Sequence, residues 1–265
     1  TYKIYAVDSA GNLSSASTNR VTVDTTAPTA PSVSGTTPTN DTTPTWSWST
    51  GGGGNGTYRY ELDNSDLTSG ATQTTSTSYT PGSGISEGSH TLYVQERDAA
   101  GNWSSSGSRT IVIDSTAPTV ISTSPANSAG SVNIASNITV IFSEVMDSTS
   151  ITTNTANTSC SGTFQVSSNN FSSCVQMTAS SPYTSDNETF TVDPSDNLSN
   201  NTTFKIRVTT GVKDPSGNSM SSDNTTGTGF TTQTGAAPTA PIVSGTTPTN
   251  DTTPTWNWST GGGGN

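Results

Sequence analysis

The sequence predicts an all-β protein that is built from several antiparallel β-sandwiches, and three observations lead to this prediction. Short runs in which apolar and polar residues alternate recur along the chain, with the period of two that marks a half-buried strand. Gly, Pro, Asn and Asp separate these runs at short intervals, and no stretch has the pattern of a capped helix of normal length. Long stretches of sequence also occur twice, so the chain repeats an architecture.

The expected strands are defined by their alternating apolar positions. Each run is short, and groups of runs fall within about 100 residues, which is the size of an antiparallel β-sandwich. In chain order the positions are Trp46 and Trp48; Tyr58, Tyr60 and Leu62; Leu92 and Val94; Ile111 and Ile113; Ile138, Val140 and Phe142; Phe190 and Val192; and Phe204, Ile206 and Val208.

Two internal repeats set the expected domain boundaries. Residues 27–55 recur at 237–265 with only two differences, Ser32 against Ile242 and Ser47 against Asn257. YAVDSAGNLSS, from Tyr5, matches the stretch VQERDAAGNWSSS. We therefore expect four parts: the C-terminal part of one domain (1–26), a complete domain of that type (27–116), a longer domain of another type (117–236) and the N-terminal part of a further domain (237–265). Because a lone two-stranded hairpin is marginal in water, we expect the chain to be a segment of a longer tandem array.

Composition and charge restrict the classes of function. The formal net charge is -11 with only eight Lys and Arg residues, so no basic surface is available for nucleic acid. No apolar run approaches the roughly 20 residues that a membrane helix needs. The acidic composition instead suits solubility and divalent cations.

Several short sequence motifs resemble those of known bacterial domains. VDTTAPTAP, followed by a strand and closed by a hairpin with DxxGN, is similar to the bacterial immunoglobulin-like (Ig-like) domains of giant surface adhesins. The words VIFSEVMDSTSI and FKIRVTTGVKDPSGNSM resemble a second bacterial Ig-like type, found in S-layer proteins, with Val145 where that type usually has proline. The resemblance implies tandem Ig-like sandwiches of Greek-key topology, arranged as an extended rod.

The two cysteines, Cys160 and Cys174, flank two strand-like stretches that would form a hairpin and bring the sulfurs together. We expect a disulfide, which indicates an oxidising compartment outside the cytosol. The alternative is a pair of free buried thiols.

Catalytic motifs find no support in the sequence. His90 is the only histidine, and no GxSxG nucleophile elbow occurs. The GGGGN stretch lacks the GK[ST] of a phosphate-binding loop and is interpreted as a flexible connection. For the five tryptophans we weigh a sugar-stacking platform against core packing, and we expect at least one of Trp46 and Trp48 in the core. The five are Trp46, Trp48, Trp103, Trp256 and Trp258. We therefore expect that the protein is not an enzyme.

The DxxGN words at Asp8, Asp98 and Asp214 are typical of tight turns, in which Asp bonds its own backbone and Gly accepts positive φ. In an Ig-like sandwich this loop faces the linker that arrives from the preceding domain. The loop after the second strand lies at the same end, so this topology pairs Asp24 with Asp98 and with the loop 51–55, and it pairs Asp114 with Asp214. Adhesins that these domains resemble often hold calcium at such joints, and calcium prefers carboxylate and carbonyl oxygens. We therefore name these four aspartates as candidate interdomain calcium ligands, with hydrogen-bonded turns as the alternative.

Two hypotheses of function follow. The first is a structural stalk or fibre segment of a large, repetitive, bacterial cell-surface or extracellular protein, with neighbouring repeats of the same chain, or other copies in a fibre, as partners. The second is an adhesion module that binds a surface glycan or receptor. Near-identical copies add length rather than recognition, so they favour the first hypothesis. Assembly through strand exchange is a further possibility.

Overall fold

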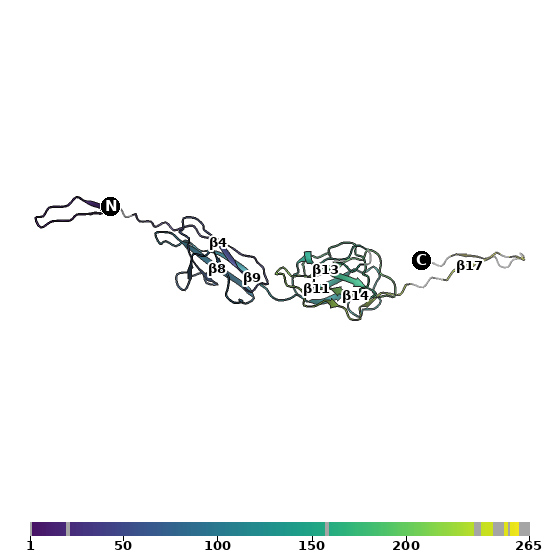
Figure 1. Cartoon of the computed structure of the whole chain (residues 1–265). Coiled ribbons are helices and arrows are strands. Elements are labelled where there is room, and N and C mark those ends of the chain that lie inside the picture. The colour runs from purple at the N-terminus through teal and green to yellow at the C-terminus, as the bar shows by residue number, and fades with distance from the viewer. Residues whose placement is uncertain are drawn as a thin grey trace. The chain divides into compact units, whose positions relative to one another are not determined.

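The computed structural model describes residues 2–19, 22–156, 159–235, 240–245, 252–253 and 255–259. It divides into two compact units, Thr1–Thr116 and Ala117–Asn265, and each has a core of its own. Apart from one short 3-10 helix, η1 (Ser148–Ser150), all regular structure in the described residues is β-strand (Figure 1). The all-β prediction is confirmed. None of the helical structure in those residues is long or apolar enough to cross a membrane.

The complete domain of the first unit is a sandwich of two antiparallel sheets. One sheet has the order β3 (Ser32–Ser34), β4 (Trp46–Ser49) and β7 (Ser78–Tyr79). The other has the order β6 (Thr72–Thr74), β5 (Thr57–Leu62), β8 (Gly88–Arg97) and β9 (Gly107–Ile113). The chain crosses from one sheet to the other between β4 and β5, so each sheet contributes one apolar face to a shared core.

The core of this domain consists of the alternating positions of the sequence. The expected strand residues Trp46, Trp48, Tyr58, Leu92, Val94, Ile111 and Ile113 are all buried. The indole N–H of Trp46 donates a hydrogen bond to the carbonyl of Arg109, 3.0 Å away, so its polar atom is satisfied inside the core. Both Trp46 and Trp48 are therefore core residues, and the sugar-platform alternative for them is wrong.

The longer domain, in the second unit, is a second sandwich. Its sheets have the orders β10 (Val120–Ser124), β11 (Ile138–Phe142), β13 (Thr189–Val192), and β12 (Phe164–Ser167), β14 (Thr203–Val208), β15 (Asn224–Thr225), with β16 (Phe230–Thr231) also paired to β14. Burial alternates along β11 and β14, and Ile138, Val140, Phe142, Phe204, Ile206 and Val208 all lie in one core. The predicted apolar faces are confirmed.

Cys160 and Cys174 form a disulfide, with their Cα atoms 4.9 Å apart. A single strand, β12, lies between them, rather than the two strand-like stretches that we expected. The segment after the turn returns alongside β12, because the amide of Val175 donates to the carbonyl of Val166 at 2.8 Å. The return of the chain along β12 places Cys174 beside the loop that carries Cys160.

Each sandwich has a short parallel pairing between the segment that follows its first strand and the C-terminal end of the domain. In the first unit, Thr39 pairs with Ile113: the amide of Thr39 donates to the carbonyl of Val112, and that of Asp114 donates to Thr39, both at 3.0 Å. In the second unit, Val132 pairs with Thr232 in the same parallel sense. Parallel pairing means that the chain enters and leaves this contact at opposite ends.

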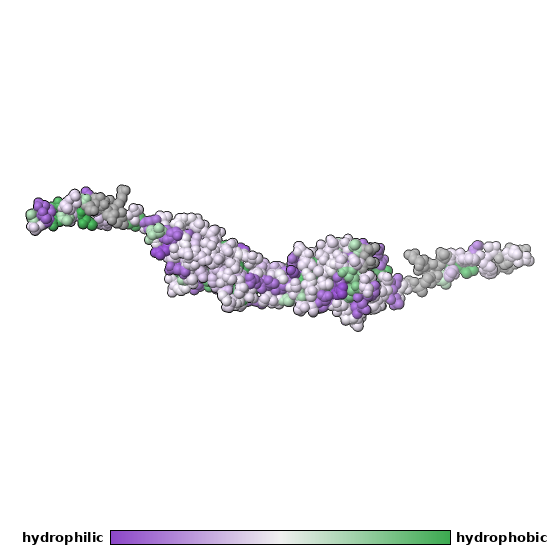
Figure 2. All heavy atoms as spheres, viewed as in Figure 1, coloured by the Kyte–Doolittle hydropathy of each residue, from purple (hydrophilic) through white to green (hydrophobic). Residues whose placement is uncertain are grey.

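Two hairpins, β1–β2 and β17–β18, repeat parts of the complete domain without its remaining strands. They consist of β1 (Tyr2–Ile4) with β2 (Ser17–Asn19), and of β17 (Ile242–Ser244) with β18 (Asn257–Ser259). The register is the same as in the complete domain, since Val243 lies opposite Trp258 just as Val33 lies opposite Trp48. Their apolar residues are exposed, and Figure 2 shows green, hydrophobic residues on the β1–β2 hairpin.

Trp48 and Trp258 occupy equivalent positions, so substituting each of them tests whether core burial stabilises the first domain. Trp48 is 5% exposed and Trp258 is 73% exposed. We expect Trp48→Ala to lower the free energy of unfolding of the first domain by about 3–5 kcal/mol, because it removes buried area and leaves a cavity. Trp258→Ala is expected to change unfolding by less than about 0.5 kcal/mol. Urea unfolding followed by circular dichroism measures both, and equal effects of the two substitutions would contradict the core assignment.

Candidate metal centre

The three DxxGN words fold as the same turn. In the two complete domains, Oδ1 of the aspartate accepts the backbone N–H of the asparagine four residues later, and Oδ2 accepts its side-chain amide: Asn102 bonds Asp98 in this way, and Asn218 bonds Asp214. The turn at Asp8 has the same bonds from Asn12. The glycine of each turn has a positive φ. The turn interpretation of the motif is confirmed.

At Asp98 and Asp8 these hydrogen bonds favour the charged form of the carboxylate. The side-chain bond from Asn102, with the backbone donors of the same loop, lowers the pKa of Asp98, and Asn12 does the same for Asp8. Asp98 and Asp214 are also buried. Each turn thus holds its carboxylate in a fixed, hydrogen-bonded position.

The expected approach of the linker to the DxxGN loop is present in the first unit. The side-chain amide of Asn102 donates to the carbonyl of Asp24 at 3.1 Å, and the amide of Thr29 donates to the carbonyl of Gly52 at 3.0 Å. The carboxylate of Asp24, however, accepts a hydrogen bond from the amide of Thr26, while that of Asp98 faces its own loop. Calcium at Asp24 and Asp98 stays a prediction.

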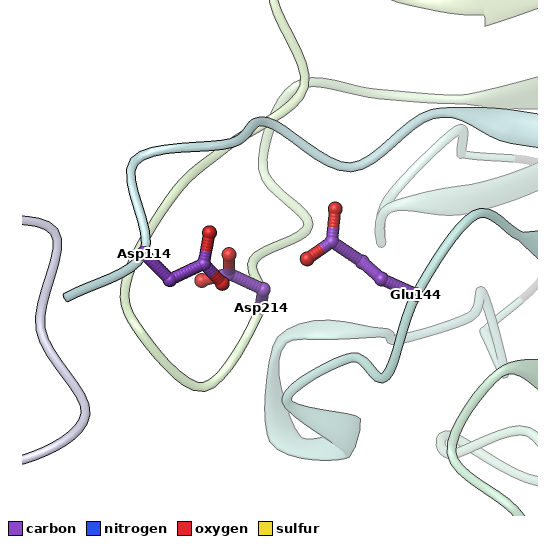
Figure 3. A group of neighbouring side chains, drawn as sticks. All are labelled: Asp114, Glu144 and Asp214. Atoms are coloured by element: carbon purple, nitrogen blue, oxygen red, sulfur yellow. The ribbon is translucent and has the colours of Figure 1, made fainter. Parts of the chain in front are cut away.

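At Asp214 the structure brings further carboxylates together. Asp114, Glu144 and Asp214 each offer one oxygen, and these oxygens all lie within 4.8 Å of one another. Figure 3 shows the three side chains directed toward a common space. Asp214 is buried, whereas Asp114 and Glu144 are partly exposed. Among the residues that the structure describes, this is the group of acidic side chains whose spacing would allow a metal ion.

The spacing and chemistry of this cluster fit calcium. Oxygens that share one Ca²⁺ at about 2.3–2.6 Å lie at most about 5 Å from each other, and the observed limit of 4.8 Å satisfies this condition. The ligand atoms are hard carboxylate oxygens, without the Cys or His that zinc prefers. Three carboxylates at this separation repel each other unless a cation or hydrogen-bond donors lie among them.

Glu144 was missed by the sequence analysis. It belongs to the word VIFSEVMD and directly follows β11, the second strand of its domain. The loop after the second strand and the DxxGN loop lie at the same end of an Ig-like sandwich. The signal was therefore present in the topology, but it had been applied only to residues 51–55 of the first domain.

His90 lies in a separate charged site, with two acceptors. Its Nδ1 lies 2.7 Å from Oδ2 of Asp63, and its Nε2 lies 2.9 Å from the carbonyl oxygen of Ser86. The hydroxyl of Ser86 is also near Nε2, at 3.4 Å. The imidazole therefore lies between a carboxylate and a serine hydroxyl, as it does in a hydrolytic triad. A carbonyl only accepts, so Nε2 carries a proton here and has no lone pair for the serine hydroxyl. Acceptors at both ring nitrogens therefore favour the protonated form of the imidazole.

Comparison with known proteins defines the class of these domains. Residues 29–115 match the model of a bacterial Ig-like domain family, and residues 114–232 match the model of a second bacterial Ig-like family. The chain thus contains two bacterial Ig-like domains of different families, as their motifs indicated. Domains of this class are typically non-catalytic.

One solved structure adds a distant likeness. The N-terminal part of the bacterial S-layer protein SbsC is 19% identical to this chain, with a TM-score of 0.30. The match covers 49% of this chain and 26% of that one. No curated protein matches the chain.

The His90 site predicts a pH dependence of stability. The hydrogen bond that His90 donates to the carboxylate of Asp63 raises the pKa of His90 above its ordinary value, so the folded state binds the proton more tightly than the unfolded state. The stabilisation is complete below about pH 6 and is lost as the pH rises through the folded pKa. We expect the free energy of unfolding of the first domain to fall between about pH 6 and 8 in the native chain, and this slope to vanish in His90→Gln. Chemical unfolding across this range is the measurement, and an unchanged slope in His90→Gln would refute it.

Proposed function

We propose that this chain is a structural segment of a bacterial cell-surface or extracellular protein, and that its domains carry tension as a spacer or fibre element. The parallel pairing at the ends of both sandwiches is the observation that carries this proposal. In each domain the segment that follows the first strand pairs in the same direction with the C-terminal end of the domain, at Thr39 with Ile113 and at Val132 with Thr232.

The mechanical consequence follows from this geometry. A pull on the two ends of a domain acts along the paired segments in opposite directions, so their hydrogen bonds are loaded together in shear. In the second unit these bonds include the amide of Val132 to the carbonyl of Thr231 at 3.1 Å and the amide of Gln233 to the carbonyl of Val132 at 2.8 Å. An antiparallel hairpin pulled apart at one end would instead lose its bonds one after another.

Other features support an extracellular structural role. The disulfide suits an oxidising compartment. The net charge of -11 keeps repeated domains soluble and disfavours association with anionic surfaces. Near-identical repeats within one chain suit a role in which copies are interchangeable.

We also propose that calcium binds to Asp114, Glu144 and Asp214 and has a structural role there. The ion would neutralise the mutual repulsion of these carboxylates. This proposal rests on the spacing of the three oxygens.

The calcium proposal predicts a stabilisation that one neutral substitution removes. At a hundredfold excess over its Kd, calcium should stabilise the second domain by about 2.7 kcal/mol. Glu144→Gln should abolish this effect, and Asp196→Asn, which removes an exposed carboxylate elsewhere, should retain it. We choose Glu144 because Asp214 also closes its own turn. Calorimetric titration with calcium, and thermal melting with and without a chelator, test the proposal. Equal melting temperatures in both conditions would contradict calcium binding at this site.

The proposal that the domains carry tension is tested by pulling the full chain in two directions. We expect a higher unfolding force for the first domain when it is pulled through its chain ends than when it is pulled through cysteines at Ser89 and Val112. These residues lie opposite each other in the β8–β9 pair, so that pull peels the strands apart. Thr39→Pro removes one donor of the parallel pairing and should lower only the end-to-end force.

The outcomes of this experiment are distinct. Equal forces in the two directions would overturn the mechanical proposal. A melting curve of Thr39→Pro shows that the variant is folded before it is pulled. The peeling force of that variant serves as the internal control, because the β8–β9 hydrogen bonds are unchanged.

A further inference from the structure

One aromatic side chain stands apart from the cores of the two complete domains. Tyr183 is 73% exposed, and it is the one largely exposed aromatic among the described residues between 27 and 235. Its backbone is nevertheless fixed, because it pairs with Thr191 on β13 through two hydrogen bonds of 2.8 and 2.9 Å. The ring therefore presents an aromatic face to solvent from an ordered backbone.

A hollow with a volume of about 400 Å³ lies beside Tyr183. This size lies within the range of about 300–1,000 Å³ that small-molecule sites have. Pro182 and Ala179 supply apolar surface next to the ring. Its polar lining comes from Asn137, Thr178, Ser181, Thr191 and Asp193.

Three of the polar side chains in this hollow keep their hydrogen-bonding capacity. In the described part of the chain, no hydrogen bond involves the side chains of Asn137, Ser181 or Asp193; the backbone carbonyl of Asp193 accepts from Thr178. The carboxylate of Asp193 only accepts, whereas the amide of Asn137 both donates and accepts. The lining therefore offers both kinds of partner around one apolar surface.

We propose that this hollow binds a neutral saccharide. A sugar ring has apolar C–H faces that pack on an aromatic ring, and hydroxyls at its rim that both donate and accept hydrogen bonds. The lining contains no basic residue and the chain carries a net charge of -11, so an anionic sugar would be repelled. The site goes beyond the load-bearing role and does not depend on it, since its residues lie outside the parallel pairing and the calcium cluster.

The test uses the ¹⁵N-labelled full chain and a panel of glucose, galactose, mannose, N-acetylglucosamine and lactose. We expect at least one sugar to shift the amide resonances of residues 178–193 in a saturable way. Tyr183→Ala and Asp193→Asn should each weaken that binding about tenfold or more. Ile121→Ala is the matched control, because Ile121 is another exposed side chain of the same domain and lies outside the hollow.

Each outcome decides the proposal. Saturable shifts at residues 178–193 that Tyr183→Ala removes and Ile121→Ala retains support it. The absence of shifts at tens of millimolar sugar overturns it, as does binding that Tyr183→Ala leaves unchanged. Because the ring is exposed, melting of Tyr183→Ala should match that of the native chain, which separates lost binding from lost folding. A negative result in this experiment would not contradict the mechanical proposal, which the force measurements test separately.

Discussion

Burial of one apolar face per hairpin is the constraint on which both domains depend. The β3–β4 and β17–β18 hairpins have nearly the same sequence and the same register, yet Trp48 is 5% exposed and Trp258 is 73% exposed. Local sequence therefore determines how two strands pair, through the turn and the alternation of side chains. It does not by itself bury them. The core forms only where the opposite sheet, with β5, β8 and β9, covers the same face.

The outer faces explain how a chain with 27% hydrophobic residues still forms two sandwiches. Only every second residue of a strand is needed for the core, and the others are largely threonine and serine. Several threonines pair across strands through their hydroxyls, as Thr91 does with Thr110 at 2.7 Å and Thr139 with Thr191 at 2.9 Å. Such pairs add to sheet stability, and β-branched threonine also fits the pleated surface. The abundance of threonine is thus part of the fold.

Sequence predicted the strands and the inward positions well, because period-two alternation is a local signal that burial acts on directly. The turns at Asp98 and Asp214 were predicted for the same reason, since Asp, Gly and Asn act within five residues. Glu144 and Tyr183 were not predicted. The role of Glu144 depends on which loops meet at one end of a sandwich, and Tyr183 is a single exposed ring whose meaning depends on the hollow beside it. Such features arise from tertiary structure and leave no periodic trace.

The turn and metal interpretations of DxxGN are compatible. A carboxylate offers about four lone-pair positions, and the hydrogen bonds from Asn218 use two of them at Asp214. The bonds from Asn102 at Asp98 are the same, so the motif alone does not distinguish the two sites. The difference is that Asp114 and Glu144 place two further carboxylate oxygens within 4.8 Å of Asp214. A repeated turn thus supplies one prepared ligand at each copy, and the residues around it decide whether that ligand has the partners a cation requires.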